Sequence, residues 1–477
     1  MFMQILAAPC ERPSSTSPPS TGTTPTRLRL LPGLRVLPSL RRKARRYFPA
    51  SIQIAEEKTV REEKEMHDVH VLDDSVDRRA AFEVFLAALC KAPVTDYEWL
   101  THGHSEEECW LGVKSAHGEI VGAAYSFPTR LTLPGGARVR AAAVTGVGVR
   151  ADATRAGRLT ALMRSQLSSA RERGDAVAVL HATQTGLYDR FGYGIASRAE
   201  SVQIAANSDW RATASSAGQV RMLSRTEAAA LLPYLQERLA GARPGGMTRT
   251  SCWWRRALNP ASPSAPGFTG SGHQGIAVHT GLDADDGFVV WNASAASPGH
   301  DWPTEIVIQQ LWAGSGAAAA GLWRFLSNLD LVDSVVGWSR PLDENLDLML
   351  VDPRHHRITG RGDDLWLRII DLSVALTSRS WGSGDPITLR IHDPFPIGTD
   401  ESISTWRISS GNVNPSRGTL PDLECNISSL APAFLGDRRP SELVTSGLWT
   451  EHAAGAAIRA DALFSVPGSA PWSGTWF

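Results

Sequence analysis

The chain has few cysteines, no long apolar segment and almost no net charge. Its five cysteines are scattered over 477 residues, and none has the C-x-x-C spacing of structural zinc sites and redox dithiols. We therefore expect a reduced, cytoplasmic protein that holds no metal. No apolar run reaches the roughly 18 residues needed to cross a bilayer. The formal net charge of −1 gives no general attraction to nucleic acid or to an anionic membrane.

The first 65 residues differ in composition from the rest. Residues 1–50 are rich in Ser, Thr, Pro and Arg and contain one acidic residue, Glu11. This composition is typical of disorder or of a transit-like leader, and the basic run at 41–46 indicates a solvated tail rather than a nucleic-acid site. A further interpretation, which we favour, is that translation begins at Met66, because residues 62–65 require purine-rich codons like those of a ribosome-binding site. We expect residues 1–65 to be a disordered or misassigned extension.

From Asp68 onward, apolar periodicity predicts packed α/β structure. The turn Pro134-Gly135-Gly136 separates two of the predicted strands. The expected elements are a helix over 75–91 and strands over 110–114, 120–130 and 138–150. Together with the segment that follows, they predict one domain over residues 66–200.

Residues 144–194 carry the most informative pattern: an apolar strand, a small-residue loop opening a helix, a second apolar strand and a tyrosine-bearing turn. The first-turn N–H groups of a helix lack intrahelical partners and lie at the positive end of its dipole, so such a loop binds anions. Gly157 lets a phosphate approach the backbone, and Arg155 and Arg158 can add charge-assisted hydrogen bonds. Because glycine-containing loops before helices are common, a strand–loop–helix without a ligand is the alternative.

This order of parts resembles the acetyl-coenzyme A site of the GNAT N-acetyltransferase superfamily. The superfamily signature, Arg/Gln-x-x-Gly-x-Gly/Ala, corresponds to residues 154–159, in which Gly157 is kept while Thr154 and Leu159 depart from the pattern. The resemblance implies that this loop and the preceding strand bind acetyl-coenzyme A. The residues it assigns to the coenzyme are Val147, Gly148, Val149, Arg155, Ala156, Gly157, Arg158, Leu159, Thr160, Thr183 and Gln184.

Residues 181–194, HATQTGLYDRFGYG, are similar to the H-A-S-x-x-G-I-Y-G-R-F-G-Y-G segment of the enhanced intracellular survival (Eis) family. Thr183 stands at a Ser of that family and Asp189 at a Gly. The resemblance implies that Tyr188 is the general acid that protonates the leaving thiolate. A phenol with a pKa of about 10 and a thiol of about 8.5 are close enough for this transfer. The alternative is a core tyrosine whose hydroxyl caps a turn.

The chain ends in Trp476 and Phe477, whereas chain ends are normally frayed and polar. In the Eis family the last residue is aromatic and its α-carboxylate serves as a base in the first domain, so the resemblance implies this role for Phe477. It likewise assigns Asp96 and Trp476 to the substrate pocket, although some relatives have an acid in place of Trp476. A free α-carboxylate titrates near about 3.5, so a base here needs burial, a water relay or a partly neutral amine. A docked tail without chemistry is the alternative.

Residues 201–350 repeat the rhythm of the first region weakly. A strand at 306–311 precedes Gly314-Ser315-Gly316 and a helix that includes 321–326, without basic residues in the loop. None of the six tyrosines lies beyond Tyr234, so this copy cannot supply a downstream tyrosine acid. We interpret it as a degenerate GNAT-like domain that shapes the substrate cleft; an unrelated α/β segment is the alternative.

Residues 351–477 form the third region, with predicted strands at 363–371 and 387–392 and a helix at 453–464. Residues 385–395 resemble the central strand of the sterol-carrier-like domain of the Eis family. The resemblance thus covers residues 66–477. It implies an α/β (α+β) fold made of two tandem GNAT-like domains followed by a sterol-carrier-like α+β domain.

The resemblance also implies a reaction. Acetyl-coenzyme A would donate its acetyl group to a primary amine of a cationic substrate, either an aminoglycoside-like polyamine or a lysine side chain, by direct attack. It further implies a homohexamer, and we expect neither a nucleic acid nor a membrane as partner. Two other functions stay open. One is a non-catalytic acyl-coenzyme A sensor or scaffold, which the departure from the superfamily signature at Thr154 favours. The other is a lipid carrier acting through the third domain. The donors between His102 and Cys109 are interpreted as a solvated loop rather than a zinc site.

Overall fold

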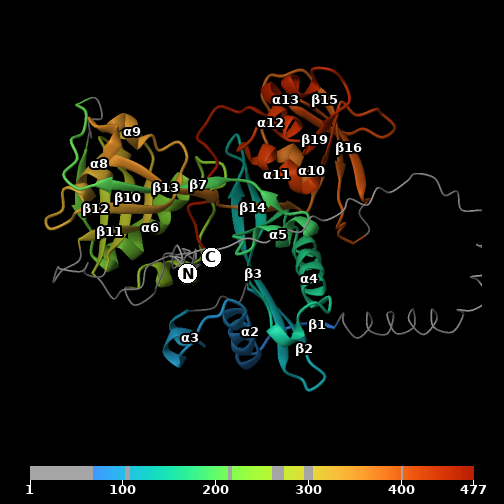
Figure 1. Ribbon diagram of the computed structural model, residues 1–477, viewed down its shortest axis with the longest axis horizontal. Helices are drawn as coiled ribbons and strands as arrows, with labels where there is room; N and C mark the ends of the chain where they lie inside the picture. The colour runs from blue at the N-terminus through green and yellow to red at the C-terminus, as the bar shows by residue number, and fades with distance from the viewer. Residues whose placement is uncertain (1–67, 103–107, 213–217, 260–272, 295–303, 399–400) are drawn as a thin grey trace, which may run out of the picture. The chain divides into compact units, whose positions relative to one another are not determined.

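The computed structural model describes residues 68–102, 108–212, 218–259, 273–294, 304–398 and 401–477. Three features expected from the sequence lie outside the described residues: the N-terminal extension, the proposed start at Met66 and most of the solvated loop between His102 and Cys109. The described residues form three β-sheets with helices packed on them (Figure 1). The predicted mixed α/β class is confirmed.

The first sheet has the strand order β1-β2-β3-β4-β5-β14-β6. Its strands are β1 (Val69–Val71), β2 (Cys109–Lys114), β3 (Ile120–Thr132), β4 (Arg138–Val149), β5 (Val177–Leu180), β6 (Gly194–Ile195) and β14 (Trp366–Ile369). Its helices are α2 (Ser75–Ala88), α3 (Asp96–His102), α4 (Arg158–Glu172) and α5 (Thr185–Tyr188), with 3₁₀ turns η3 (Ala151–Ala153) and η4 (Asp189–Phe191). Asp74 caps α2, since its side chain accepts hydrogen bonds from the amides of Val76 and Asp77. The predicted helix and three strands of this region are confirmed, with small shifts at their ends.

The second sheet has the order β13-β7-β12-β11-β10-β9-β8. Its strands are β7 (Arg198–Ala205), β8 (Gln219–Met222), β9 (Gln274–Thr280), β10 (Asp285–Ala293), β11 (Glu305–Ala313), β12 (Ser334–Pro341) and β13 (His356–Asp363). Its helices are α6 (Arg225–Ala240), α7 (Ser251–Ala257), α8 (Gly316–Ser327) and α9 (Leu346–Met349), with the turn η5 (Pro353–His355). The parallel unit β11–α8–β12 repeats the parallel unit β4–α4–β5. The weak repeat predicted around residues 306–326 is therefore present in the fold.

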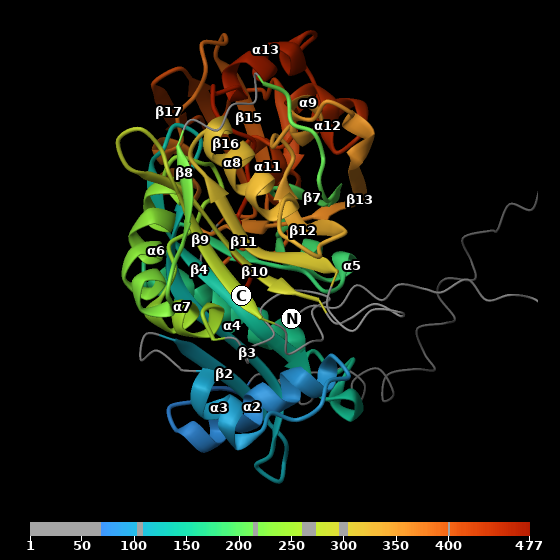
Figure 2. The ribbon, with the colours of Figure 1, turned by 90° about the vertical axis from the view of Figure 1, so that its left-hand side faces the viewer.

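The third sheet has the order β17-β16-β15-β18-β19, which puts β15 at its centre. Figure 2 labels its strands β15, β16 and β17. Its strands are β15 (Ile387–His392), β16 (Ile403–Ser409), β17 (Asn412–Pro415), β18 (Leu423–Asn426) and β19 (Trp449–Glu451). Its helices are α10 (Leu372–Ser378), α11 (Ile427–Leu435), α12 (Pro440–Thr445) and α13 (Ala456–Phe464). The expected central strand and C-terminal helix are observed in these positions.

Near the domain boundaries expected at residues 200 and 350, some strands belong to a different sheet from the one their position in the sequence suggests. β7 begins at Arg198 yet lies in the second sheet, between β12 and β13. β13 also pairs with β7, and β14 lies between β5 and β6 of the first sheet. The third sheet thus starts only with β15, well after residue 351. Between β13 and β14, the chain passes from the second sheet to the first within Asp364 and Leu365.

Helix α4 shows how the cores form. Its apolar face buries Leu162, Met163 and Leu167 completely against the first sheet, as the helical spacing of these residues predicted.

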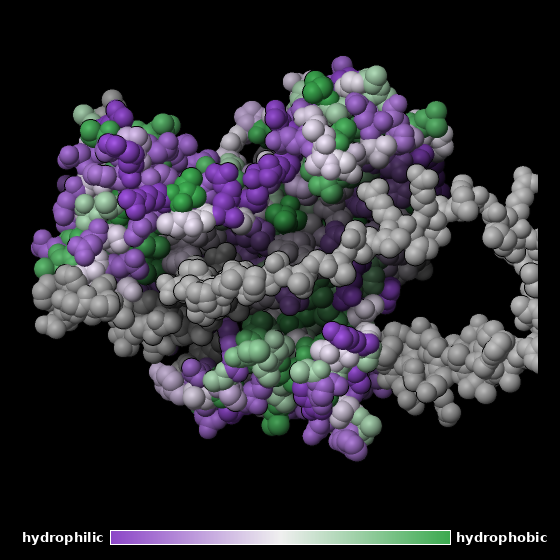
Figure 3. All heavy atoms as spheres, in the orientation of Figure 1, coloured by the Kyte–Doolittle hydropathy of each residue, from purple (hydrophilic) through white to green (hydrophobic). Residues whose placement is uncertain are grey.

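On the face shown in Figure 3, apolar residues gather over the part of the first domain that contains α2 and β2. Val76 of α2 is 75% exposed and Leu100 of α3 is 79% exposed. Within the described ranges, none of the helices has the length and apolarity that a membrane span requires.

Candidate active site

The first domain contains a parting of two parallel strands. β4 and β5 pair from Ala141–Val177 to Ala143–Val179 and then diverge, while β4 continues against β3 to Val149. A bulge at Gly146, whose φ is +62°, bends β4 away. A Cβ at this position would lie 2.3 Å from the ring of Tyr125, so only glycine fits. Parting leaves backbone N–H and C=O groups without ladder partners, and these groups need a ligand, a side chain or water.

Three of the residues assigned to the coenzyme, Val147, Gly148 and Val149, form the end of β4 beside this parting. Gly148 is also enclosed from behind, because a Cβ there would meet the Cα of Phe85 in α2 at 2.8 Å. The β4 backbone is therefore held between α2 and the space left by β5.

The loop after β4 leads directly into α4. Arg155 has φ +60° and Gly157, the residue before the helix, has φ +77°. Gly157 has no side chain that could cap this helix, so first-turn amides such as those of Leu159 and Thr160 are free to bind another acceptor among the described residues or a ligand. Ala156 is half-buried and Arg155 is exposed. The arrangement fits an anionic phosphate group.

Two side chains of this segment donate hydrogen bonds to backbone carbonyls of the preceding 3₁₀ turn. Arg158 donates from Nη1 to the carbonyl of Ala153 at 2.8 Å, and the hydroxyl of Thr154 donates to the carbonyl of Ala151 at 3.0 Å. Thr154, one of the two departures from the superfamily signature, thus stabilises the 3₁₀ turn. Arg155 is exposed and forms no ion pair with the described residues.

Tyr188 ends α5, close to the start of α4. It is 6% exposed and belongs to the apolar cluster that includes Val144 of β4 and Met163 of α4. Burial raises the pKa of Tyr188 to about 12. Within the described ranges, its hydroxyl makes no hydrogen bond to protein. Tyr188 is therefore a neutral phenol with a free donor at neutral pH. Thr183 and Gln184, which precede α5, are both exposed.

The C-terminal residues enter the same region. The ring of Phe477 packs edge-on against Phe127 of β3, with centroids 5.4 Å apart, and lies 4.9 Å from the ring of His181. Phe127 pairs with Ala143, the last residue of β4 that still pairs with β5. His181 directly follows β5. The chain thus ends beside the parting of β4 and β5, and its carboxylate forms no ion pair with any described residue.

Trp476 is held on both sides. Its indole stacks on the imidazole of His181 with centroids 4.2 Å apart, and its carbonyl accepts a hydrogen bond from Nε1 of Trp253 at 2.8 Å. Asp96, in contrast, starts α3 with a carboxylate that is 85% exposed and accepts from Nη1 of Arg79 at 2.6 Å. No hydrogen bond or ion pair joins Asp96 to the C-terminal residues within the described part of the chain.

Two polar residues at this site had no role assigned from the sequence. His181 contacts the carbonyls of Asp364 and Thr475, at 2.6 and 2.7 Å. The side chain of Asp364 is 1% exposed and binds the tail residue Ser473. His181 opens the Eis-like motif, a signal that was available; Asp364 follows no recognisable motif. Among the described residues, no three His, Cys, Asp or Glu side chains gather as metal ligands would.

Three protein-family models match the chain. Acetyltransferase (GNAT) domain models match residues 77–196 and 245–369, and a sterol carrier protein domain model matches residues 372–474. These matches confirm the three-part fold predicted from the sequence, including the GNAT-like nature of the second domain.

Individual relatives point the same way. An uncharacterized N-acetyltransferase of Streptomyces griseus is 31% identical over 368 residues, which are 74% of this chain and 86% of that protein. The N-acetyltransferase Eis of Mycobacterium tuberculosis is 30% identical over 271 residues, which are 55% of this chain and 63% of that protein. The crystal structure of Eis1 from Mycobacterium abscessus matches with a TM-score of 0.73 and 30% identity, over 86% of this chain and 100% of that chain.

The second GNAT model ends at residue 369, the last residue of β14, and the sterol carrier model begins at 372, the first residue of α10. Sequence families and strand membership therefore divide the chain at the same point. The chain belongs to the Eis-like family of GNAT N-acetyltransferases, with two GNAT domains followed by a sterol-carrier-like domain.

Proposed function

We propose that the first domain transfers an acetyl group from acetyl-coenzyme A to a primary amine of a cationic acceptor by direct attack. The observation that carries this proposal is the packing of Phe477 against Phe127 and His181, where β4 and β5 part. This packing places the negative charge of the last residue next to the apolar cluster of the first domain that contains Phe127. A primary ammonium group is the chemical complement of that charge.

The coenzyme supplies the activated acetyl group when bound. In the proposal, its pyrophosphate is held by the loop and helix start formed by Arg155, Ala156, Gly157, Arg158, Leu159 and Thr160. Further contacts with the coenzyme come from Thr183 and Gln184. The thioester carbonyl is polarised by the backbone of Val147, Gly148 and Val149. The uncapped start of α4 and the unpaired edge of β4 support this assignment. Holding both reactants in one cleft supplies proximity, which often accounts for several kcal/mol of the barrier.

Tyr188 donates its hydroxyl hydrogen toward the leaving sulfur. Because burial raises its pKa to about 12, the gap to a thiol of about 8.5 corresponds to about 5 kcal/mol for complete transfer. The phenol therefore acts first as a hydrogen-bond donor whose contribution grows as charge develops on the sulfur. Its burial also keeps the hydroxyl protonated across the physiological pH range.

The α-carboxylate of Phe477 attracts the acceptor and removes its proton. A free α-carboxylate is a weak base, so the proposal gives it two roles: holding the ammonium form and passing its proton to water. The absence of an ion pair to this carboxylate within the described ranges supports both roles. Trp476 provides an aromatic edge beside it.

Asp96 is proposed as an outer contact for a polyamine. Its carboxylate is largely exposed but already pairs with Arg79 at 2.6 Å. An incoming ammonium group would have to share it, so the contribution of Asp96 to acceptor binding is expected to be small. The proposed acceptors are aminoglycoside-like polyamines and lysine side chains.

An acceptor screen tests the proposal. Release of free thiol from acetyl-coenzyme A is measured with aminoglycosides, histone-like peptides and arylamines, and mass spectrometry counts the acetyl groups on each product. We expect turnover with at least one polyamine and acetylation of more than one of its amines. Coenzyme binding without turnover on every amine would favour a sensor instead.

The match of residues 372–474 to a sterol carrier model favours a second candidate function, lipid binding by the third domain. Lipid extracted from the purified protein and identified by mass spectrometry would support it. A protein free of lipid that still acetylates amines would leave the first domain as the functional part.

We also propose that the chain forms a homohexamer and is located in the cytoplasm. Exposed apolar residues such as Val76 and Leu100 support burial of this surface in an oligomer. The proposed homohexamer predicts a light-scattering mass about six times the 51.5 kDa of one chain. The proposed cytoplasmic location is supported by Cys90, Cys109, Cys252 and Cys425, all of which are free thiols.

A further inference from the structure

The second domain contains the same parting of parallel strands as the first. β11 and β12 pair from Glu305–Ser334 to Ile308–Gly337 and then diverge. β11 also has a bulge there, since Val290 pairs with Gln310 while its neighbour Trp291 pairs with Ile308. In the first domain the corresponding space is assigned to the coenzyme. In the second domain an indole from the end of the chain, that of Trp472, fills it.

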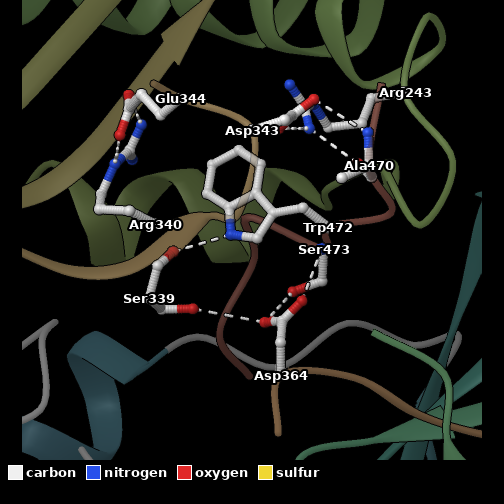
Figure 4. Close-up of polar contacts among 9 residues, drawn as sticks. All are labelled: Arg243, Ser339, Arg340, Asp343, Glu344, Asp364, Ala470, Trp472 and Ser473. Atoms are coloured by element: carbon white, nitrogen blue, oxygen red, sulfur yellow. Dashed lines mark hydrogen bonds and ion pairs between the residues drawn. The ribbon is translucent and has the colours of Figure 1, made fainter. Parts of the chain in front are cut away.

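Trp472 contacts both diverging strands. Its Nε1 donates to the carbonyl of Ser339 in β12 at 2.7 Å (Figure 4). Its ring packs on Trp312 of β11 with centroids 4.6 Å apart. The side chain is 4% exposed. A cavity of about 20 Å³ is left beside it, which is space for about one water molecule. Trp472 therefore leaves little room between these strands.

Side chains also satisfy the backbone that parting has freed. Nη1 of Arg340 reaches across from β12 and donates to the carbonyl of Leu311 in β11 at 2.9 Å. With the indole on Ser339, a carbonyl of each strand has found a side-chain donor. Buried backbone carbonyls need hydrogen-bond donors. Because these two carbonyls already have side-chain donors, they do not need a ligand.

The start of α8 is closed to a phosphate. Ser315 caps it by accepting from the amide of Ala318 at 3.1 Å, whereas Gly157 leaves α4 without a side-chain cap. The hydroxyl of Ser315 in turn donates to Asp286 at 3.0 Å, so a carboxylate lies at this helix start. A negative group there opposes a second anion. Among the described residues of the second domain, both the strand parting and the helix start are therefore already occupied by side chains.

We propose that the parting of β11 and β12 is a binding site for the chain's own C-terminal segment, residues 470–477, and that Trp472 is its anchor. Anchored there, the segment positions the carboxylate of Phe477 in the first domain. This last step rests on the proposed function; the docking of the segment does not. Trp472 is a positioning residue, since it acts on the reaction only through Phe477.

Further contacts clamp the segment next to the anchor. Asp343 accepts from the amide of Ala470 at 2.9 Å, and Arg243 donates to the carbonyl of Ala470 at 2.7 Å (Figure 4). Asp364 accepts from both the amide and the hydroxyl of Ser473 at 2.8 Å. The buried Asp364 carboxylate also accepts from Ser197 at 2.8 Å and from Ser339 at 3.4 Å, so it is satisfied by donors from three parts of the chain.

The anchor limits how far the terminal carboxylate can move. Thirteen residues, 465–477, follow the end of α13 at Phe464, and a free segment of that length spans up to about 44 Å. From Trp472 only five residues remain, which span at most about 17 Å. Anchoring therefore confines the carboxylate to a far smaller volume and raises its effective concentration at the cleft.

The test compares three variants of the full chain: Trp472→Ala, Trp472→Phe and the control Trp449→Phe. Trp449 matches the anchor, because it is 2% exposed and its Nε1 also donates to a carbonyl, that of Ser429 at 3.0 Å. It lies in β19 of the third sheet, and within the described ranges it makes no hydrogen bond or ring contact with residues 470–477. Trp472→Phe keeps a ring but loses the hydrogen bond, and it serves as the test variant if Trp472→Ala does not fold.

Two readouts separate docking from chemistry. Hydrogen exchange at the Ser473 amide, which Asp364 binds, reports docking without any turnover. For Trp472→Ala we expect this exchange to accelerate by about 100-fold or more. We expect kcat to fall by about 10-fold or more while KM for acetyl-coenzyme A changes by less than about twofold. Trp472→Phe should lie between wild type and Trp472→Ala, and Trp449→Phe should match wild type in both readouts.

Each failure has its own meaning. Unchanged exchange at Ser473 in the Trp472 variants would overturn the anchoring inference, whatever the activity. Rapid exchange with unchanged kcat would show that Trp472 docks the segment but that the Phe477 carboxylate is not needed, and this would overturn the positioning role and the proposed base. Calorimetry provides an independent check: the inference predicts one bound coenzyme per chain, and two per chain would contradict it.

Discussion

The imidazole of His181 lies flat on the indole of Trp476, with ring centroids 4.2 Å apart and planes 23° from parallel. Its Nδ1 and Nε2 face two carbonyl oxygens, those of Asp364 and Thr475. His181 thereby joins the end of β5, the Asp364 connection and the C-terminal segment in one contact.

Replacing His181 by Phe tests this contact. Phenylalanine keeps the stacking on Trp476 but donates no hydrogen bond, which leaves the buried carbonyls of Asp364 and Thr475 without this partner. We expect kcat to fall by about 10-fold and the free energy of unfolding to fall by about 1–3 kcal/mol. Steady-state kinetics and urea unfolding measure the two effects. Wild-type values of both would show that the contact is dispensable.

Tyr188→Phe tests the proposed acid. We expect kcat to fall by about 100-fold or more, because the leaving sulfur loses its donor. The dissociation constant of acetyl-coenzyme A, measured by calorimetry, should stay within about twofold.

Tyr193→Phe is the matched control for this variant. The ring of Tyr193 lies 5.9 Å from that of Tyr188, and its buried hydroxyl makes no hydrogen bond to any residue that the structure describes. Its removal should leave kcat unchanged and stability equal or higher. Equal losses in the two variants would mean that packing, not proton donation, explains the effect.

Arg155→Asn tests the phosphate loop. Asparagine tolerates the φ of +60° found at this position, so the change removes charge without adding backbone strain. We expect KM for acetyl-coenzyme A to rise by about 5- to 10-fold, with kcat and the acceptor KM unchanged. The exposed Arg417, in the third domain, provides the control Arg417→Asn, which should have no effect. An unchanged KM in Arg155→Asn would remove Arg155 from the site.

The helices, strands and phosphate loop of the first domain were predictable because they follow local patterns. Apolar periodicity marks α4 within one short segment, and the Gly157 loop precedes it directly. The central strand β15 likewise carries its own pattern. Local signals of this kind need no knowledge of the rest of the chain.

The contacts that complete the site were not predictable in the same way. His181 and Thr475 are 294 positions apart, and Asp364 and Ser473 are 109 apart. The insertion of β14 between β5 and β6 has no local pattern either, because its four residues are a short apolar strand like many others. Only tertiary pairing decides which sheet such a strand joins.

Stability at high pH follows from the buried tyrosines. Burial raises the pKa of Tyr188 and of Tyr125 to about 12, whereas an unfolded tyrosine titrates at about 10. Between these values the unfolded state binds fewer protons than the folded state, so the free energy of unfolding falls as pH rises. Each tyrosine contributes a loss of up to about 2.7 kcal/mol between pH 10 and pH 12.

Urea unfolding from pH 9 to pH 12 measures this effect. The decline should be smaller in Tyr188→Phe and smaller again when Tyr125 is also replaced by Phe. A pH dependence that is the same in wild type and in both variants would contradict the assignment of these raised pKa values.

The chain's last carboxylate is the centre of the proposed chemistry, and its removal is the most direct test. Semisynthesis by ligation of a short C-terminal peptide yields the same chain ending in either a carboxylate or a carboxamide at Phe477. The two differ in one charge and keep the rings of Trp476 and Phe477. We predict that kcat/KM for a polyamine falls by about 100-fold in the carboxamide form while coenzyme binding is unchanged. Equal kcat/KM in the two forms would contradict the account.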